Sequence, residues 1–98
     1  MKHLEEIINE KVPTLVAFAH ADKAEAEEVK QMVEELRTKY AGKANIVHFD
    51  NPFNNRVSQD FRITAYPTYI VFKEGQELMS ESGKKTINQL SELVERAF

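Results

Sequence analysis

Residues 63–75 read I-T-A-Y-P-T-Y-I-V-F-K-E-G, an apolar run that opens at a proline and closes at Glu-Gly. Proline is tolerated at the first residue of a strand, whereas inside a sheet it removes a hydrogen-bond donor. Pro67 therefore marks where pairing begins, and residues 68–72 supply the β-branched and aromatic side chains of a buried strand. Gly75 can take the positive φ that a tight hairpin turn often requires, so residues 76–82 are predicted to return as an antiparallel partner.

The chain before this hairpin alternates helix and strand patterns. Residues 14–19 form a continuous apolar run, which is typical of a central strand covered on both faces. Asp22 and Glu25 form a capping box, which predicts the start of a long amphipathic helix that runs to Tyr40. The same periodicity arguments predict a short first helix with Leu4, Ile7 and Ile8 on one face, whose pattern ends at Val12-Pro13. They also predict a strand at residues 44–49 and a short helix at residues 55–62.

A last helix follows the hairpin. Thr86 and Gln89 repeat the capping-box spacing, and the predicted buried stripe of this helix is Ile87, Leu90, Leu93, Val94, Ala97 and Phe98. In this order of elements the first two strands are parallel, through a right-handed crossover, and the last two form an antiparallel hairpin. The sequence therefore predicts an α/β fold, a mixed four-stranded sheet flanked by helices on both faces, in one domain over residues 1–98.

Composition excludes several classes of function. The chain has 98 residues, 13 Lys and Arg, 16 Asp and Glu, and a net charge of −3. Nucleic acid is not an expected partner because it requires a basic face. No apolar run approaches the roughly 18 residues of a membrane helix, so we expect no membrane partner and a cytoplasmic location. The absence of cysteine excludes disulfides, thiolate metal sites and thiol-disulfide exchange by this chain.

Residues 63–75 resemble the cis-proline segment of the thioredoxin superfamily, where a similar proline opens the same hairpin. Four more stretches resemble the family in order: V-P-T-L-V-A-F-A, Y-A-G-K, F-D-N-P and G-K-K-T-I-N-Q-L. The resemblance implies a thioredoxin-like fold and a cis bond before Pro67. It also implies that the family's additional first strand is missing, because only three residues precede Leu4.

The resemblance breaks down where the family has its active site. The W-C-G-P-C motif of a thioredoxin falls on residues 22–26, so Lys23 and Ala26 occupy the positions of the two cysteines. Ala17 occupies the position of the buried aspartate that assists proton transfer in the family. The comparison therefore implies that the chain has no catalytic residues and needs no cofactor.

Peptide binding, which is one part of the family's activity, needs no cysteine. In the family, the residue before the cis-proline offers its backbone N–H and C=O to an extended peptide. We therefore expect a protein or extended peptide to bind a surface formed by Asp22, Lys23, Tyr66, Pro67 and Thr68. The simpler interpretation is that Lys23 is only a solvated charge and that Pro67 only shapes the loop.

No metal site is expected. His20 and Asp22 lie two residues apart after a strand, but zinc sites need three or four protein ligands.

The leading hypothesis is a redox-inactive, peptide-binding or protein-binding module. The alternative is a thiol-disulfide oxidoreductase of the same family whose cysteines are replaced in this chain, and a third option is a purely structural subunit. Without the additional strand, residues 44–49 form a sheet edge. We expect a monomer, with an edge-to-edge homodimer as the alternative.

Overall fold

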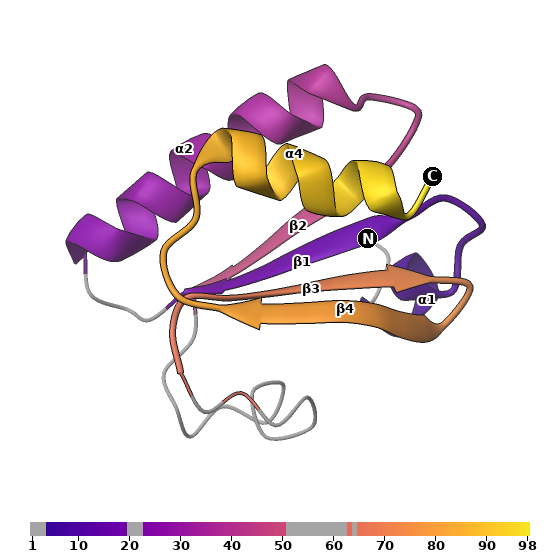
Figure 1. Ribbon diagram of the computed structural model, residues 1–98, viewed down its shortest axis with the longest axis horizontal. Coiled ribbons are helices and arrows are strands. Elements are labelled where there is room, and N and C mark those ends of the chain that lie inside the picture. The colour runs from indigo at the N-terminus through magenta and orange to yellow at the C-terminus, as the bar shows by residue number, and fades with distance from the viewer. Residues whose placement is uncertain (1–3, 20–22, 51–62, 64) are drawn as a thin grey trace.

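The structure is a computed structural model that describes residues 4–19, 23–50, 63 and 65–98. Four strands form one sheet in the order β2-β1-β3-β4. Helices α2 and α4 lie side by side on one face of the sheet, and α1 lies on the other (Figure 1). The elements are α1 (Leu4–Ile8), β1 (Thr14–Ala19), α2 (Lys23–Lys39), β2 (Asn45–Asp50), β3 (Thr68–Lys73), β4 (Gln76–Ser82) and α4 (Ile87–Arg96).

Strand β1 is the centre of the core. All six of its residues are buried, as the unbroken apolar run predicted. It pairs in parallel with β2 and antiparallel with β3. Its side chains alternate between two hydrophobic clusters, with Leu15 and Ala17 facing α2 and α4, and Val16 and Phe18 packing with Ile8 of α1 on the other face. The mixed sheet with helices on both faces is therefore confirmed.

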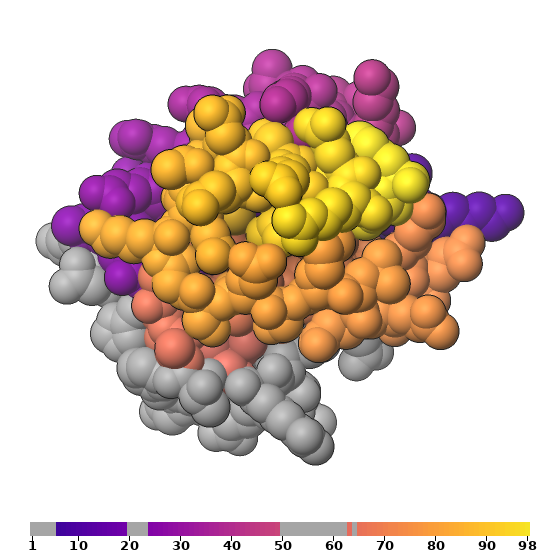
Figure 2. Space-filling view, viewed as in Figure 1, coloured from indigo at the N-terminus to yellow at the C-terminus, as the bar shows by residue number. Residues whose placement is uncertain are grey.

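The β3–β4 hairpin closes through Glu74 and Gly75, both at positive φ, 52° and 82°. The Gly75 N–H donates to the Ile8 carbonyl at 2.9 Å, which ties the turn to α1. The sequence predicted the positive φ of Gly75 but not that of Glu74. The register of the hairpin shifts between Val71 and Phe72, so Leu78 of β4 has no paired residue in β3, and its side chain is 44% exposed. Along its length β4 forms an exposed edge below α4 (Figure 2).

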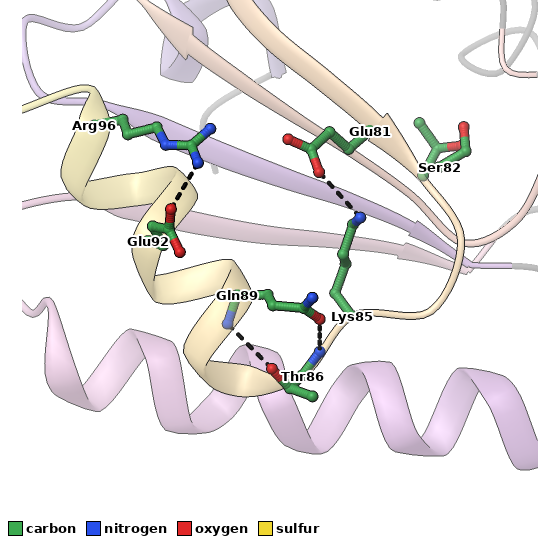
Figure 3. Close-up of polar contacts among 8 residues, drawn as sticks. Glu81, Ser82, Lys85, Thr86, Gln89, Glu92 and Arg96 are labelled. Atoms are coloured by element: carbon green, nitrogen blue, oxygen red, sulfur yellow. Dashed lines mark hydrogen bonds and ion pairs between the residues drawn. The ribbon is translucent and has the colours of Figure 1, made fainter.

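The capping box of α4 is confirmed. The Gln89 N–H donates to the Thr86 hydroxyl at 3.2 Å, and the Thr86 N–H donates to the Gln89 side chain at 2.8 Å (Figure 3). Phe98 was wrongly assigned to the buried stripe. The helix ends at Arg96, and Phe98 is 56% exposed. The centroids of the Phe98 and Tyr40 rings lie 5.7 Å apart, with the rings in an edge-on arrangement.

Strand β2 begins one residue later than predicted, because the Ala44 N–H is used in the turn after α2, where it donates to the Tyr40 carbonyl at 3.0 Å. The Asn45 N–H donates to the Pro13 carbonyl at 2.8 Å. The N–H and C=O groups of Asn45 therefore point toward β1, and those of Ile46 point away from β1, toward the outer side of β2. The Arg37 side chain donates to the outward Ile46 carbonyl at 2.9 Å.

Within the described ranges, no strand pairs with the outer side of β2, in agreement with the predicted sheet edge. None of the helices described is long and apolar enough to cross a membrane. The helix predicted at residues 55–62 and the cap predicted at Asp22 lie outside the described residues.

Candidate functional site

The candidate site lies at one end of the sheet. Strand β1 ends there at Ala19, β3 begins there at Thr68, and α2 begins there at Lys23 (Figure 1). The fold therefore brings the predicted site residues Lys23, Tyr66, Pro67 and Thr68 to the same end of the molecule. Asp22 and His20 lie outside the described residues.

The segment before β3 is held by internal hydrogen bonds. The Tyr66–Pro67 peptide bond is cis. The Thr68 hydroxyl donates to the Ala65 carbonyl at 2.6 Å and lies 3.1 Å from the Ser82 hydroxyl. Thr68 is only 4% exposed and Pro67 is buried, whereas Tyr66 is half-buried. Tyr66 is therefore the residue of this trio whose side chain contributes to the surface, and the Thr68 side chain has an internal, structural role.

The first turn of α2 contains no thiol. Ala26 is 7% exposed and packs in the same cluster as Tyr69 of β3. Ala17 is fully buried and contributes only a methyl group. The three positions that would carry thiols and a carboxylate in the family are thus occupied by Lys23, Ala26 and Ala17.

Tyr69 is a feature of this site that the sequence analysis missed. It lies directly opposite Ala17 in the β1–β3 ladder, so its ring rises on the same face, beneath α2. The residue is 1% exposed, and its hydroxyl has no hydrogen-bond partner in the described part of the chain. Burial, together with the smaller effect of the Glu25 and Glu28 carboxylates, raises the pKa of Tyr69 to about 12.

Glu25 adds a second polar atom without a partner. Its Oε1 is buried and accepts no hydrogen bond from the described residues, although the residue as a whole is half-buried. In the sequence, Tyr69 is only one more aromatic residue of a predicted strand. The only signal was that the small Ala17 of β1 pairs with the large Tyr69 of β3. This pairing depends on the strand register, which is known only from the structure.

Among the residues that the structure describes, no group of three His, Asp or Glu side chains could hold a metal ion.

The family model for thioredoxin matches residues 1–96, so the chain belongs to the thioredoxin family. A thioredoxin of Staphylococcus saprophyticus is 34% identical over 68 residues, which are 69% of this chain and 65% of that protein. The match thus spans slightly less than two thirds of the staphylococcal relative. Thioredoxin 1 of Nostoc sp. is 28% identical over 92 residues, 94% of this chain and 86% of that protein.

Solved structures support the same fold. A designed protein has a TM-score of 0.82 at 20% identity, covering 95% of this chain and 82% of its own. A malarial protein has a TM-score of 0.73 at 17% identity, covering 88% of this chain and 97% of its own. At these identities the likeness concerns the fold alone. The chain is a thioredoxin-fold protein that contains no cysteine.

Proposed function

We propose that this chain is a redox-inactive member of the thioredoxin family that binds a protein or an extended peptide. The binding surface comprises the start of α2, with Asp22 and Lys23, and the segment Tyr66, Pro67 and Thr68. The observation that carries the proposal is a contrast within one site. The thiols and the carboxylate are replaced, whereas the segment before β3 keeps an ordered set of hydrogen bonds through Thr68 and Pro67.

An extended peptide would pair with the backbone beside Tyr66. Recognition by main-chain hydrogen bonds requires a rigid, exposed backbone segment and no particular side-chain chemistry. Two features support this mode, since Ala65 and Tyr66 retain exposed surface and the Gly83 N–H fixes the Pro67 carbonyl at 2.9 Å. The segment is therefore ordered before a peptide arrives, which reduces the entropy lost on binding.

The first test separates binding from catalysis. In an insulin-reduction assay with dithiothreitol, the pure chain should give no turnover above buffer, because attack on a disulfide requires a thiolate. Turnover that persists after contaminating thioredoxin is removed would overturn the redox-inactive assignment.

The second test concerns binding. A library of 12-residue peptides displayed on phage is selected against the immobilised chain, and an enriched peptide is titrated into the isotope-labelled protein. Amide shifts should concentrate at residues 65–68 and in the first turn of α2. An absence of enriched sequences would overturn the proposal, and so would shifts confined to another surface, such as the cleft between α2 and α4 lined by Lys39, Asn88 and Ser91.

The alternative is a thiol-disulfide oxidoreductase whose cysteines are replaced in this chain, and the similarity to proteins named thioredoxin favours it. Lys23→Cys combined with Ala26→Cys distinguishes the two. Both positions lie in the first turn of α2, three residues apart, so they face the same side and can be bridged. We expect a disulfide but weak reductase activity, because Ala17 offers no carboxylate. Activity close to that of a thioredoxin would favour the alternative.

We also propose that the chain is monomeric. Strand β2 has an open edge, but Arg37 occupies its outward Ile46 carbonyl, and an edge protected in this way pairs less readily. Sedimentation across a dilution series should give one monomeric species. A concentration-dependent dimer that Arg37→Ala strengthens would instead identify pairing through β2, whereas a dimer insensitive to that change would use a different surface.

A further inference from the structure

A hollow lies between α2 and α4, which run side by side on one face of the sheet (Figure 1). Its volume is about 490 Å³, which falls within the usual size range of small-molecule pockets. None of its lining residues belongs to the proposed peptide surface. Three of them come from α2 and three from α4, namely Glu35, Thr38, Lys39, Ile87, Asn88 and Ser91.

The Lys39 side chain reaches across the hollow from α2 to α4. Its ammonium donates to the Ser91 hydroxyl at 3.2 Å and lies 5.2 Å from the centroid of the Tyr40 ring. Ser91 is only 5% exposed, so its hydroxyl is a polar group at the bottom of the hollow. Glu35 precedes Lys39 by four residues, the spacing and order that favour an ion pair along a helix. Lys39 nevertheless forms no ion pair with any of the described residues.

The charged groups around the hollow define its electrostatics. Glu35 and Lys39 are the two that line it, so its lining is neutral but carries separated charges. Three further charges line an adjoining hollow that shares Lys39. Glu92 pairs there with Arg96 at 2.6 Å, and Glu95 accepts a hydrogen bond from the buried tyrosine hydroxyl at 2.5 Å. Glu35 has neither an ion pair nor a hydrogen bond in the described part of the chain, so it faces the hollow as an uncompensated anion opposite an uncompensated cation.

The chemistry of the lining defines the ligand that would fit it. An ammonium group has three donors, and Lys39 uses one of them on Ser91, so a carboxylate can take the others together with the Asn88 amide. Glu35 can only accept hydrogen bonds, so it suits an ammonium group. A phosphate would bring two negative charges to a lining that holds one cation. Ile87 is half-buried against the larger core cluster and supplies an apolar wall.

We propose that this hollow binds a free α-amino acid with an aliphatic side chain. The ligand carboxylate accepts hydrogen bonds from Lys39 and Asn88, its ammonium donates to Glu35, and its aliphatic side chain contacts Ile87. The two charges of an α-amino acid are borne by groups on one carbon, so the ligand bridges Glu35 and Lys39 where the direct ion pair is missing. The site is independent of the proposed peptide surface.

The test titrates L-leucine into the isotope-labelled chain at low salt. Amide shifts should saturate with a dissociation constant on the order of 1–10 mM and should concentrate at residues 35–39 and 87–91. Two analogues remove one charge each, since N-acetyl-L-leucine lacks the ammonium and L-leucinamide lacks the carboxylate. Each should bind at least about 10-fold more weakly than leucine, because each loses a charge-assisted hydrogen bond. Raising the salt concentration should weaken the binding of leucine.

Four variants assign the binding to the hollow. Glu35→Gln should remove the preference for leucine over N-acetyl-L-leucine, and Lys39→Met should remove the preference for leucine over L-leucinamide. Glu27→Gln and Lys30→Met remove the same charges from exposed positions nearer the start of α2, and both should preserve the two preferences. Amide spectra and thermal unfolding establish that each variant is folded.

Several results would overturn the inference. They are the absence of saturable shifts at leucine concentrations of about 50 mM, shifts confined to residues outside the hollow, and equal binding of leucine and its two analogues. Preferences that persist unchanged in Glu35→Gln and Lys39→Met would overturn it as well. Peptide binding at Tyr66 is measured separately, so each of these results leaves the proposed function unaffected.

Discussion

Replacing Tyr69 by phenylalanine should stabilise the protein. The substitution removes one hydroxyl and leaves the buried ring in place opposite Ala17. In the described part of the chain this hydroxyl has no hydrogen-bond partner, so folding takes it out of water without compensation. A buried polar group in this situation costs about 1–3 kcal/mol. Because the removal also leaves a small void, we expect a net gain of about 1 kcal/mol in the free energy of unfolding at neutral pH.

The difference in the free energy of unfolding between the parent chain and Tyr69→Phe should increase as the pH rises above 10. The pKa of Tyr69 is raised from 10.0 to about 12 in the folded chain, chiefly by burial and also by Glu25 and Glu28. Folding therefore retains the phenolic proton. This contribution to stability is fully present below pH 10 and is lost as the pH rises toward 12. The two pKa values correspond to a loss of roughly 3 kcal/mol in the parent that Tyr69→Phe should not show.

Urea unfolding of both proteins at pH 7 and at several values between pH 9 and 11.5 measures these effects. Tyr40→Phe is a matched control with the opposite sign at neutral pH. The Tyr40 hydroxyl donates to Glu95 Oε2 at 2.5 Å, so its loss should destabilise the chain by about 1–3 kcal/mol. A Tyr69→Phe variant that is less stable than the parent at pH 7 would refute the reasoning, since it would mean that the Tyr69 hydroxyl is hydrogen-bonded in solution.

Three further substitutions test the fold and the altered centre by equilibrium unfolding. Ala17→Asp places a carboxyl group in a fully buried position, which raises the pKa of that group. The free energy of unfolding should fall by at least about 2 kcal/mol at pH 7 and by less near pH 4, where the carboxyl group is neutral. Equal losses at the two pH values would contradict the burial of position 17. Gly75→Ala should cost more than Gly42→Ala, because both glycines have positive φ but only at Gly75 would a Cβ collide with the Asn9 side chain. Thr86→Ala should cost about 1 kcal/mol by removing the cap of α4, and Thr86→Ser should restore most of it.

The elements of the fold could be predicted because their signals are local. The apolar run at β1, the proline before β3 and the capping box at Thr86 each depend on a few neighbouring residues, and each was confirmed. The errors fell where a boundary depends on tertiary contacts. Phe98 continues the apolar period of α4, but the helix ends two residues earlier, and the Phe98 side chain is exposed although that of Ala97 is buried.

The site was predictable only in part, for a related reason. The replaced thiols could be located from the sequence, because Lys23 and Ala26 lie in one stretch. The pairing of Ala17 with Tyr69 joins residues 52 positions apart, and it emerges only from the strand register. The orientation of Thr68 was equally invisible, because a threonine at the start of a strand can face either way. Because of its internal hydrogen bonds, the Thr68 side chain is not available to the proposed partner, and this segment can offer only its backbone and the Tyr66 side chain.

The last turn of α4 has a mechanical consequence. The Lys73 ammonium of β3 donates to the Ala97 carbonyl at 3.1 Å, and the Phe98 ring contacts Tyr40, just beyond the end of α2. The end of α4 is thus fastened to two elements that are remote in the sequence. A tether or a fused domain attached after Phe98 would transmit its load directly to the sheet and to the neighbouring helix, instead of unravelling the final turn of α4 alone.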